Sequence, residues 1–287
     1  MPTASGMHVV PSSAPLGAEI VGVDLSEEMD EQTFLAIDAA YNEHTVIVFR
    51  NQQVTPAQHL RFAHRFGELE ISPRTQFALP GYPEILLLSN ILDANGQPIG
   101  NADAGRTWHT DLSYTATPPR GSLLYALEVP YNEHGKALGE TRFVSTAAAY
   151  DALPEEMKQQ LHGLRALHRA GAKQYAPGSQ LADAVKDLPD VIHPVIRTHP
   201  VTGRRAIYVR VGECVGIVGM PDQKALPLIQ ELSDFATRPE FLYRHQWRVG
   251  DLLMWDNCCG QHLAVKDYDL PQRRLMHRVT VNGSVPV

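Results

Sequence analysis

The sequence predicts a mainly β fold, a double-stranded β-helix (a cupin-like jelly-roll) with flanking helices. Three observations favour it. Strand patterns outnumber helical ones, and residues 241–248 alternate between two kinds of side chain. The chain of 287 residues, 44% of them hydrophobic, is also long enough to bury one sizeable core. Because such alternation is typical of a sheet with one covered and one wetter face, we expect a single domain spanning residues 1–287.

The N-terminal half is predicted to alternate strands with helices. Apolar side chains recur at helical spacing within residues 31–43. Thr55 and Pro56 are typical of a helix start, with a capping hydroxyl before a proline at the first helical position, and this second helix should end near Gly67. Strands are expected at residues 19–25, 45–50 and 85–88.

Strands dominate the second half of the predicted fold. Ser145 is expected to cap a helix that continues to Leu153, where Pro154 interrupts it, and residues 222–236 form a later surface helix. Residues 172–190 are rich in small, polar and charged side chains, and we interpret them as a mobile flap. Strands are expected at residues 194–199 and 205–210, joined by a turn at 200–203, and at 241–248, 252–255 and 275–282.

Composition and charge exclude several classes of function. The 25 basic and 32 acidic residues give a formal charge of −7, and no dense basic cluster interleaved with aromatic residues occurs, which argues against nucleic-acid binding. Three cysteines, two of them adjacent, form a poor set for disulfides, so a reducing cytoplasm is expected. With no signal pattern and no run of about 18 apolar residues, no membrane association is expected either.

The pair His109 and Asp111, with the distant His262, carries the most chemical information. Two imidazoles and one carboxylate can bind one face of a ferrous ion and leave the other face open. A chain with 13 histidines should show a His-x-acid triplet about once by chance, and this chain shows it only at His109. On a strand the two residues would share one face. The alternative is that His109 is an ordinary half-buried histidine and that Asp111 caps a turn.

Three arginines follow His262: Arg273, Arg274 and Arg278. The guanidinium group presents a planar set of donors that binds a carboxylate through two parallel hydrogen bonds. A dicarboxylate that chelates iron at one end needs such a partner at the other. The alternative is a solvated strand face, which we expect at least for Arg273, because neighbouring strand residues point to opposite sides.

Further motifs surround these residues along nearly the whole chain. They include Trp-His-Thr-Asp at 108–111 followed by Thr-Pro-Pro at 117–119, Ala-Ala-Tyr-Asp-Ala-Leu at 148–153, Thr-His-Pro at 198–200 with Thr-Gly-Arg at 202–204, Trp-Asp-Asn at 255–257, and Met-His-Arg at 276–278. In this combination the chain resembles the Fe(II)/2-oxoglutarate-dependent dioxygenases of the taurine dioxygenase and 2,4-dichlorophenoxyacetate dioxygenase (TauD/TfdA) family.

The resemblance implies a role for each matched residue. It makes His109, Asp111 and His262 the iron ligands, assigns Arg274 and Thr141 to the distal carboxylate of 2-oxoglutarate, and brings Arg278 near an anionic group of the substrate. The implied cofactors are Fe(II), 2-oxoglutarate as co-substrate, and dioxygen. The implied reaction converts 2-oxoglutarate to succinate and carbon dioxide and hydroxylates a substrate carbon, commonly with cleavage of the adjacent bond. Hydroxylation is favoured because related halogenases lack the carboxylate that Asp111 supplies.

The chain departs from the family pattern in three places. The loop at 131–140 is longer and ends in Gly-Glu-Thr at 139–141, so it is a candidate lid. Cys258 and Cys259 stand where relatives commonly have an arginine; they could line the site or be small buried hydrophobic residues. Residues 70–75 lack the histidine and tyrosine that taurine dioxygenases present to the sulfonate. Taurine itself is therefore not the expected substrate.

The expected substrate is a small organic anion, such as a sulfonate, a sulfate ester or a phenoxyalkanoate. Arg278 is the leading charge partner, and Arg106 and Lys173 are further candidates unless they are solvated loop charges. By analogy with relatives, a homo-oligomer, dimer or tetramer, is expected. Two other classes stay open: a non-catalytic metal-binding barrel, and a zinc hydrolase that uses the same three ligands. In neither would Arg274 and Thr141 have a purpose.

Overall fold

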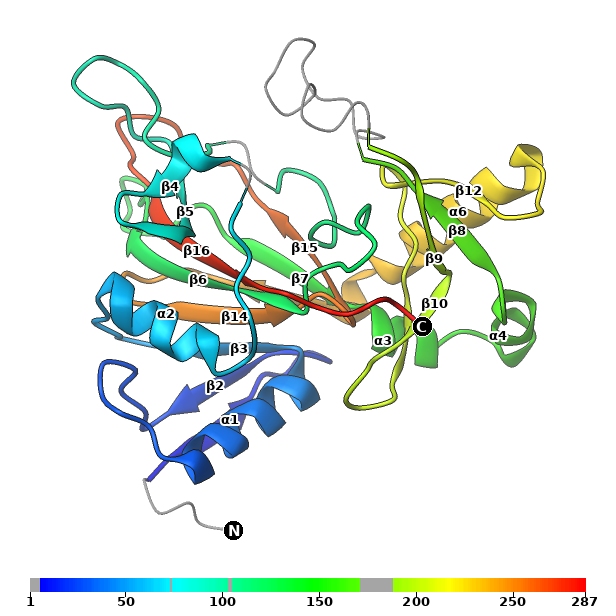
Figure 1. The fold of residues 1–287 in the computed structure, drawn as a ribbon, viewed down its shortest axis with the longest axis horizontal. Helices are drawn as coiled ribbons and strands as arrows, with labels where there is room; N and C mark the ends of the chain where they lie inside the picture. Colours follow the sequence, from blue (N-terminus) through cyan, green and yellow to red (C-terminus); the bar gives the residue numbers. More distant parts are fainter. Residues whose placement is uncertain (1–5, 73, 103–104, 171–187) are drawn as a thin grey trace.

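The structure is a computed structural model. It describes residues 6–72, 74–102, 105–170 and 188–287. The predicted flap at 172–190 and Lys173 fall largely or wholly outside these residues. Strands dominate, as predicted, and helices flank them at two places (Figure 1). No helix in the described ranges is long and apolar enough to cross a membrane.

The largest sheet contains eight strands drawn from both ends of the chain. In spatial order the strands are β1 (His8–Pro11), β2 (Ala18–Val21), β3 (Val46–Phe49), β14 (Leu252–Asp256), β6 (Gly121–Glu128), β16 (Leu275–Val281), β5 (Tyr82–Ser89) and β4 (Ala78–Leu79). Neighbouring strands pair antiparallel, except that β2 runs parallel to β3. The C-terminal strands β14 and β16 lie on either side of β6, in the middle of the sheet.

A three-stranded sheet packs against one face of the large sheet. Its central strand β7 (Thr141–Ser145) pairs with β13 (Leu242–His245) and β15 (Gly260–Ala264). The core between the two sheets joins Phe143 and Trp247 to Leu124, Leu253 and Met276 of the large sheet. Burying a side chain of this size stabilises a fold by about 1.5–3 kcal/mol. This interlayer core therefore fixes the distance at which the two sheets face each other.

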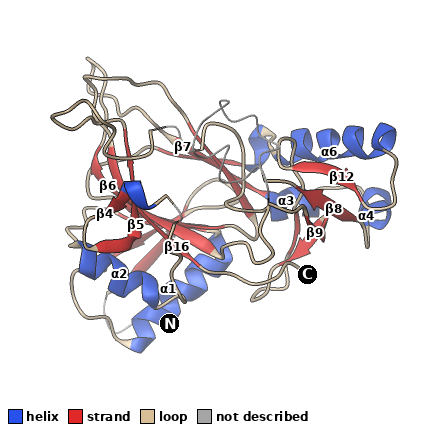
Figure 2. Ribbon diagram, turned by 45° about the horizontal axis from the view of Figure 1, so that its top comes forward, coloured by secondary structure: helices blue, strands red, loops and turns tan. Residues whose placement is uncertain are grey.

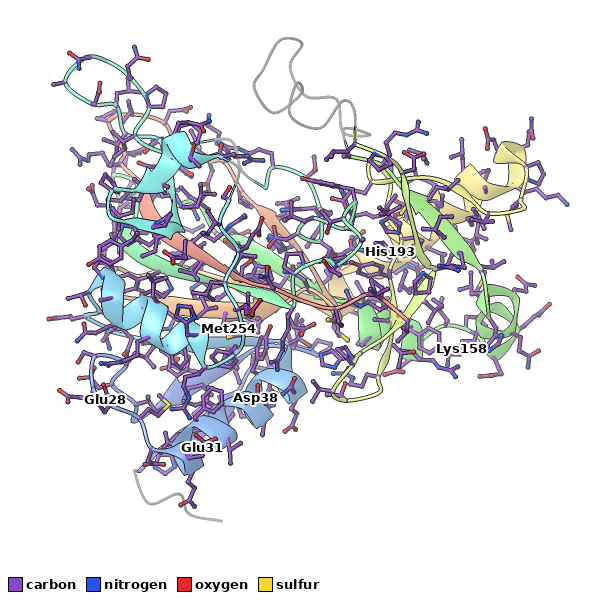
Figure 3. All side chains as sticks on the ribbon, in the orientation of Figure 1. Glu28, Glu31, Asp38, Lys158, His193 and Met254 are labelled. Carbon is purple, nitrogen blue, oxygen red and sulfur yellow. The ribbon has the colours of Figure 1, made fainter. Side chains whose placement is uncertain are left out.

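Two helices cover the opposite face of the large sheet: α1 (Glu31–His44) and α2 (Pro56–His64). Thr55 caps α2 as predicted, since its hydroxyl accepts from Gln58 N while Gln58 Oε1 accepts from Thr55 N. In Figure 3, Met254 lies on the sheet above α1, which carries Glu31 and Asp38. Both faces of the central strands are thus covered.

The remaining elements form a lobe at one end of the sheets, with its own core (Figure 2). A second three-stranded sheet and a two-stranded hairpin pack there against helices. The sheet consists of β12 (Cys214–Ile217), β8 (Arg165–His168) and β9 (Val191–Pro194), the hairpin of β10 (Ile196–Thr198) and β11 (Arg205–Ile207), and the helices are α3 (Thr146–Asp151), α4 (Glu155–Leu161) and α6 (Asp222–Ala236). Two short 3-10 helices, η1 (Thr75–Phe77) and η2 (Pro239–Phe241), complete the described elements.

Several predicted boundaries are wrong for identifiable reasons. The strand predicted at 19–25 ends at Val21, because Gly22 has φ +83° and a Cβ there would lie 2.5 Å from Gly6 O. The strand predicted at 194–199 is divided at Val195, because the chain passes there from pairing with β8 to pairing with β11. The strand predicted at 241–248 spans only 242–245, yet its alternation persists: His245 and Trp247 are buried, whereas the residues between and beside them are exposed.

Candidate metal centre and co-substrate site

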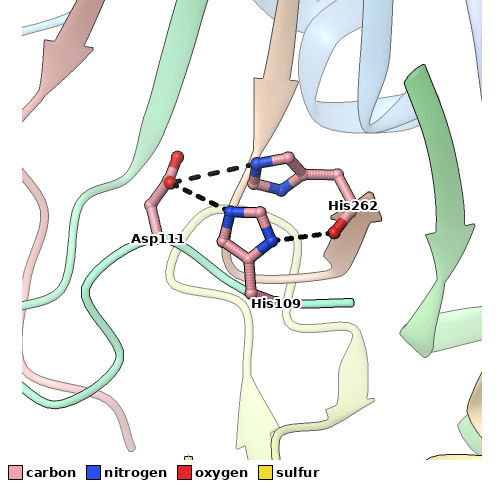
Figure 4. A group of neighbouring side chains, drawn as sticks. All are labelled: His109, Asp111 and His262. Carbon is pink, nitrogen blue, oxygen red and sulfur yellow. Dashed lines mark hydrogen bonds and ion pairs between the residues drawn. The ribbon is translucent and has the colours of Figure 1, made fainter. Parts of the chain in front are cut away.

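The structure brings His109, Asp111 and His262 together in the interior (Figure 4). The Nε2 atom of His109 lies 3.8 Å, and that of His262 3.9 Å, from the same oxygen, Oδ1 of Asp111. The two imidazole ring centroids are 4.0 Å apart. These separations exceed hydrogen-bond length, so the two nitrogens and the oxygen surround a space instead of bonding directly.

Backbone pairing explains how residues so far apart in sequence meet. His109 N donates to His262 O at 3.0 Å, and His262 N donates to His109 O at 2.9 Å, which forms an isolated antiparallel bridge. His262 belongs to β15. The expectation that His109 and Asp111 are carried by a strand is wrong: pairing does not extend beyond His109, and Asp111 opens a turn in which Leu112 has φ +48°.

Hydrogen bonds assign the proton of His109. Its Nδ1 lies 2.9 Å from Thr107 O and 3.0 Å from His262 O. Carbonyl oxygens only accept, so Nδ1 carries the proton and donates it. In the neutral ring Nε2 then has a lone pair directed to the Asp111 side, which is the form that ligates a metal.

Asp111 is kept ionised by its surroundings. Burial alone would raise the pKa of Asp111, but the charge of Arg278 holds the pKa below its usual value. Ser122 Oγ donates to Oδ2 at 2.9 Å, and Asn257 Nδ2 lies 3.5 Å from the same oxygen. The carboxylate therefore has its second oxygen fixed while Oδ1 faces the imidazoles.

Aromatic side chains pack against the imidazole of His262. Its ring stacks on Phe143 at a centroid distance of 6.0 Å and lies 4.8 Å from the ring of Trp255. Trp255 Nε1 also donates to Asn257 Oδ1 at 3.2 Å. Sequence reasoning assigned no role to Asn257, although it closes the Trp-Asp-Asn motif, and nothing in the sequence pointed to Ser122.

Arg274 is buried at the start of β16. Its side chain is 7% exposed, one terminal nitrogen donates to Tyr268 Oη at 3.3 Å, and Nε has no hydrogen-bond partner among the described residues. Gly139 packs closely on Tyr268, the partner of Arg274, because a Cβ at Gly139 would lie 2.9 Å from the Tyr268 ring. By contrast Arg273 is solvated, as predicted, and pairs with Glu128 at 2.8 Å.

Thr141, the predicted partner of Arg274 in co-substrate binding, begins β7 and is 4% exposed. It lies two residues before Phe143, and alternate strand residues share a face, so its side chain points to the interlayer core. Trp247 Nε1 donates to Thr141 Oγ1 at 2.9 Å. Neither Trp247 nor Tyr268 was selected from the sequence; each contacts one of the predicted co-substrate residues, Trp247 contacting Thr141 and Tyr268 contacting Arg274.

Arg278 lies beside the three metal-capable residues, with one terminal nitrogen 3.5 Å from Asp111 Oδ1. Glu70 approaches the same face: its N–H donates to Thr280 O at 2.9 Å in an antiparallel pairing, and Thr280 shares a strand face with Arg278. Burial raises the pKa of Glu70. Arg106, a further candidate, donates locally to Ala102 O at 2.6 Å.

A second buried group has similar residue types: His199, Asp256 and Cys258. Here His199 Nε2 lies 3.1 Å from Asp256 Oδ2, within hydrogen-bond distance. The thiols of Cys258 and Cys259 pack against Ala147 and Ala206, and burial raises their pKa. This packing supports the interpretation of both cysteines as small buried hydrophobic residues.

The loop at 131–140 contains a turn that an antiparallel β-bridge between Tyr131 and Ala137 closes. The side chain of Asn132 accepts hydrogen bonds from the N–H groups of His134 and Lys136, at 3.0 and 2.9 Å. A role for this loop as a lid stays a prediction.

Curated relatives match almost the whole chain. Pentalenolactone F synthase of Streptomyces avermitilis is 34% identical over 97% of this chain and 94% of that protein. The alpha-ketoglutarate-dependent 2,4-dichlorophenoxyacetate dioxygenase of Cupriavidus pinatubonensis is 34% identical over 92% and 93%. The alpha-ketoglutarate-dependent sulfate ester dioxygenase of Pseudomonas putida is 34% identical over 100% and 93%.

A solved structure has the same fold. The crystal structure of a taurine dioxygenase from Burkholderia xenovorans superimposes with a TM-score of 0.81 and 33% identity, covering 98% of this chain and 91% of that one. The model of the family described as taurine catabolism dioxygenase TauD, TfdA family, matches residues 8–280. The chain therefore belongs to the TauD/TfdA family of dioxygenases.

Proposed function

We propose that this protein is an Fe(II)- and 2-oxoglutarate-dependent dioxygenase that hydroxylates a small organic anion, with His109, Asp111 and His262 as the iron ligands. One observation carries the assignment: the two Nε2 atoms face one carboxylate oxygen at 3.8 and 3.9 Å. Histidine and aspartate at hydrogen-bond distance would neutralise each other, whereas donors held apart around a space suit a shared cation.

The donor set fits Fe(II). Two neutral imidazole nitrogens and one carboxylate oxygen bind one face of the ion and leave the other open. When bound, Fe(II) with 2-oxoglutarate and dioxygen supplies the oxidising chemistry that yields succinate, carbon dioxide and a hydroxylated product. The protein contributes a fixed tautomer at His109 and an ionised Asp111, so the ligands need no rearrangement before the ion binds.

Arg274 and Thr141 are proposed to bind the distal carboxylate of 2-oxoglutarate. Arg274 offers a buried Nε donor with no protein partner among the described residues, and a guanidinium in a water-poor site binds a carboxylate strongly. This residue also separates the proposal from its alternatives. A zinc hydrolase or a non-catalytic metal-binding barrel would require the three metal-capable residues but would leave Arg274 buried without a function.

Arg278 is proposed to bind the acidic group of the substrate. Its guanidinium is near the metal-capable residues, where Asp111 is its contact at 3.5 Å. Glu70 on the same face is a further acidic side chain, which disfavours a second acidic group of the substrate nearby. A monoanionic head group is therefore expected, as in an aryloxyacetate or a sulfate ester, the substrate types that the names of two relatives print. Cleavage of the bond beside the hydroxylated carbon would follow.

The finer architecture and setting belong to the same proposal. We infer that the two facing sheets form a double-stranded β-helix, or jelly-roll, and that residues 1–287 fold as one domain. The three cysteines, all within the described residues, are free, which supports a reducing, cytoplasmic setting. A homo-oligomer, dimer or tetramer, is proposed by analogy with relatives, and the small anionic substrate is the expected ligand.

Anaerobic titration tests this function. Fe(II) is added to the metal-free protein, and 2-oxoglutarate follows while the visible spectrum is recorded. A weak metal-to-ligand absorption band that saturates at one equivalent of iron is expected, and succinate release with aryloxyacetates, sulfonates and sulfate esters then identifies the substrate class. If no band develops although iron binds, the dioxygenase assignment is wrong.

A further inference from the structure

Trp247 makes a hydrogen bond whose direction is fixed by chemistry. Its Nε1 lies 2.9 Å from Thr141 Oγ1, and both residues are buried, with 1% and 4% of their surfaces exposed. An indole N–H can only donate, so the threonine oxygen must accept. A hydroxyl has one proton, and here that proton is directed away from the indole.

Within the described residues, no protein group accepts a hydrogen bond from the Thr141 hydroxyl. Thr141 pairs through its backbone with His245 on one side and Ala264 on the other, and neither pairing involves its hydroxyl. A buried hydroxyl proton without an acceptor costs free energy comparable to a lost hydrogen bond. The Thr141 hydroxyl is thus prepared to donate to a ligand, which a carboxylate oxygen would satisfy and another donor would not.

The indole is itself prevented from turning away. The ring of His245 packs against it edge to face, with centroids 4.5 Å apart and an interplanar angle of 81°. His245 Nε2 lies 3.1 Å from Asp251 Oδ2, which also accepts from Arg248 N at 2.8 Å and from Arg50. Both His245 and Asp251 are fully buried, so the imidazole that packs against the indole is itself held in place.

We propose that Trp247 is a positioning residue that orients the Thr141 hydroxyl as a donor to the distal carboxylate of the co-substrate. This inference rests on the proposed function and adds to it. The distal carboxylate is then bound by two hydrogen-bond donors, the Thr141 hydroxyl and the Arg274 guanidinium. The selectivity for a 2-oxo acid with a second carboxylate therefore depends in part on the indole of Trp247, which does not contact that carboxylate.

The test compares Trp247→Phe with wild type in the Fe(II)-loaded protein under anaerobic conditions. Replacing the indole with a phenyl ring keeps aromatic bulk and removes the N–H. Titration of the visible band should show 2-oxoglutarate binding weakened roughly tenfold, the equivalent of one net hydrogen bond. Binding of 2-oxobutanoate, which lacks the distal carboxylate, should change less than about twofold, because the oriented hydroxyl has nothing to donate to.

A double-mutant cycle and a matched control sharpen the result. In a Thr141→Val background, Trp247→Phe should cause no further loss of 2-oxoglutarate affinity. Tyr41→Phe is the control, since it removes one buried hydrogen bond, from Tyr41 Oη to Trp255 O at 3.2 Å, on the helix-covered side of the large sheet. It should leave the ratio of the two affinities unchanged.

A measurement without substitution covers the case in which Trp247→Phe does not fold. The protein has three tryptophans, so the NMR spectrum of the Zn(II)-loaded protein contains three indole N–H signals. Addition of 2-oxoglutarate should shift the Trp247 signal, and 2-oxobutanoate should leave it in place. Equal weakening of both 2-oxo acids in Trp247→Phe, additive effects in the cycle, or an unmoved Trp247 signal would each overturn the inference. Absence of the visible band in wild type would instead contradict the proposed function.

Discussion

Two buried groups in this protein have nearly the same composition and opposite chemistry. In the group of His109, Asp111 and His262, both Nε2 atoms lie almost 4 Å from the carboxylate oxygen. In the group of His199, Asp256 and Cys258, the imidazole is hydrogen-bonded to the carboxylate at 3.1 Å. Both offer three donor atoms within 4.8 Å of one another, so proximity alone does not distinguish them.

Proton positions distinguish the two groups. His199 Nδ1 accepts from the N–H groups of Val201 and Thr202, at 3.1 Å each, so its proton is on Nε2 and is donated to Asp256. The other oxygen of Asp256 accepts from Cys258 N and Cys259 N. Every strong donor and acceptor of His199 and Asp256 is thus used within the protein. His109 is arranged the other way, with the proton on Nδ1 and the lone pair of Nε2 facing the site.

The largest effect is expected from removing a ligand in the first group. His262→Ala should weaken Fe(II) binding by at least about 100-fold, more than the loss of a residue that merely supports a ligand. His199→Ala, the matched control, should still bind one equivalent of iron. Anaerobic Fe(II) titration measures both, and an unchanged affinity in His262→Ala would contradict the assignment of the first group.

The next effect separates the metal from the co-substrate. Arg274→Ala removes a buried guanidinium and should raise the KM for 2-oxoglutarate roughly 100-fold, because two charge-assisted hydrogen bonds are lost. Fe(II) binding should not change. The neighbouring Arg273→Ala provides the control, since Arg273 is exposed and pairs with Glu128. Equal losses in the two variants, or a parallel loss of iron affinity in Arg274→Ala, would show that Arg274 has another role.

A smaller effect is expected from the second group, and on stability instead of binding. His199→Ala leaves the Asp256 carboxylate without its imidazole partner and two N–H groups without an acceptor. The free energy of unfolding should fall by about 2 kcal/mol, as measured by urea denaturation of the metal-free protein. A loss of stability that appears only when iron is present would instead mean that His199 binds metal.

The last effect depends on pH and concerns a buried histidine whose ring makes no hydrogen bond within the described residues. Burial, aided by His277, lowers the pKa of His59 to about 3, and both ring nitrogens of His59 lack a partner among the described residues. In the unfolded state His59 therefore binds a proton near pH 6.5, whereas in the folded state its imidazole stays neutral until the pH falls to about 3. Stability from this group is complete above pH 6.5 and is lost as the pH falls towards 3.

For His59→Phe we expect the decline in unfolding free energy below pH 6.5 to become shallower by about 1.4 kcal/mol per pH unit, the value for one proton. Urea denaturation at pH 7, 6, 5 and 4.5 measures the slope. A slope equal to that of the wild type would mean that His59 titrates equally in both states.

Local signals in the sequence predicted a good part of the fold. The helix at 31–44 follows from apolar spacing, and that at 56–64 from its cap and proline. Strand β6 was not predicted, because both of its faces are covered and its residues do not alternate. The bounds of β2 depend on Gly22 meeting Gly6, a contact between segments that no local pattern encodes.

In the candidate site, too, some residues could be predicted from the sequence and others could not. Residue types and motifs predicted the three metal-capable residues and Arg274, because these side chains are the ones proposed to bind the metal or the co-substrate directly. Trp247 and Asn257 were not assigned because they act by orienting another side chain, and that depends on distances across strands. The physical difference between the group of His109 and that of His199 could not be predicted from the sequence, since it lies in less than 1 Å of separation and in the position of one proton.

Anomalous diffraction at the iron edge, from crystals grown anaerobically with Fe(II), tests the central claim most directly. The account predicts one anomalous peak, within coordination distance of Nε2 of His109, Nε2 of His262 and an oxygen of Asp111, and no peak beside His199. A peak between His199, Asp256 and Cys258, or the absence of iron from the space between the two imidazoles and Asp111, would contradict it.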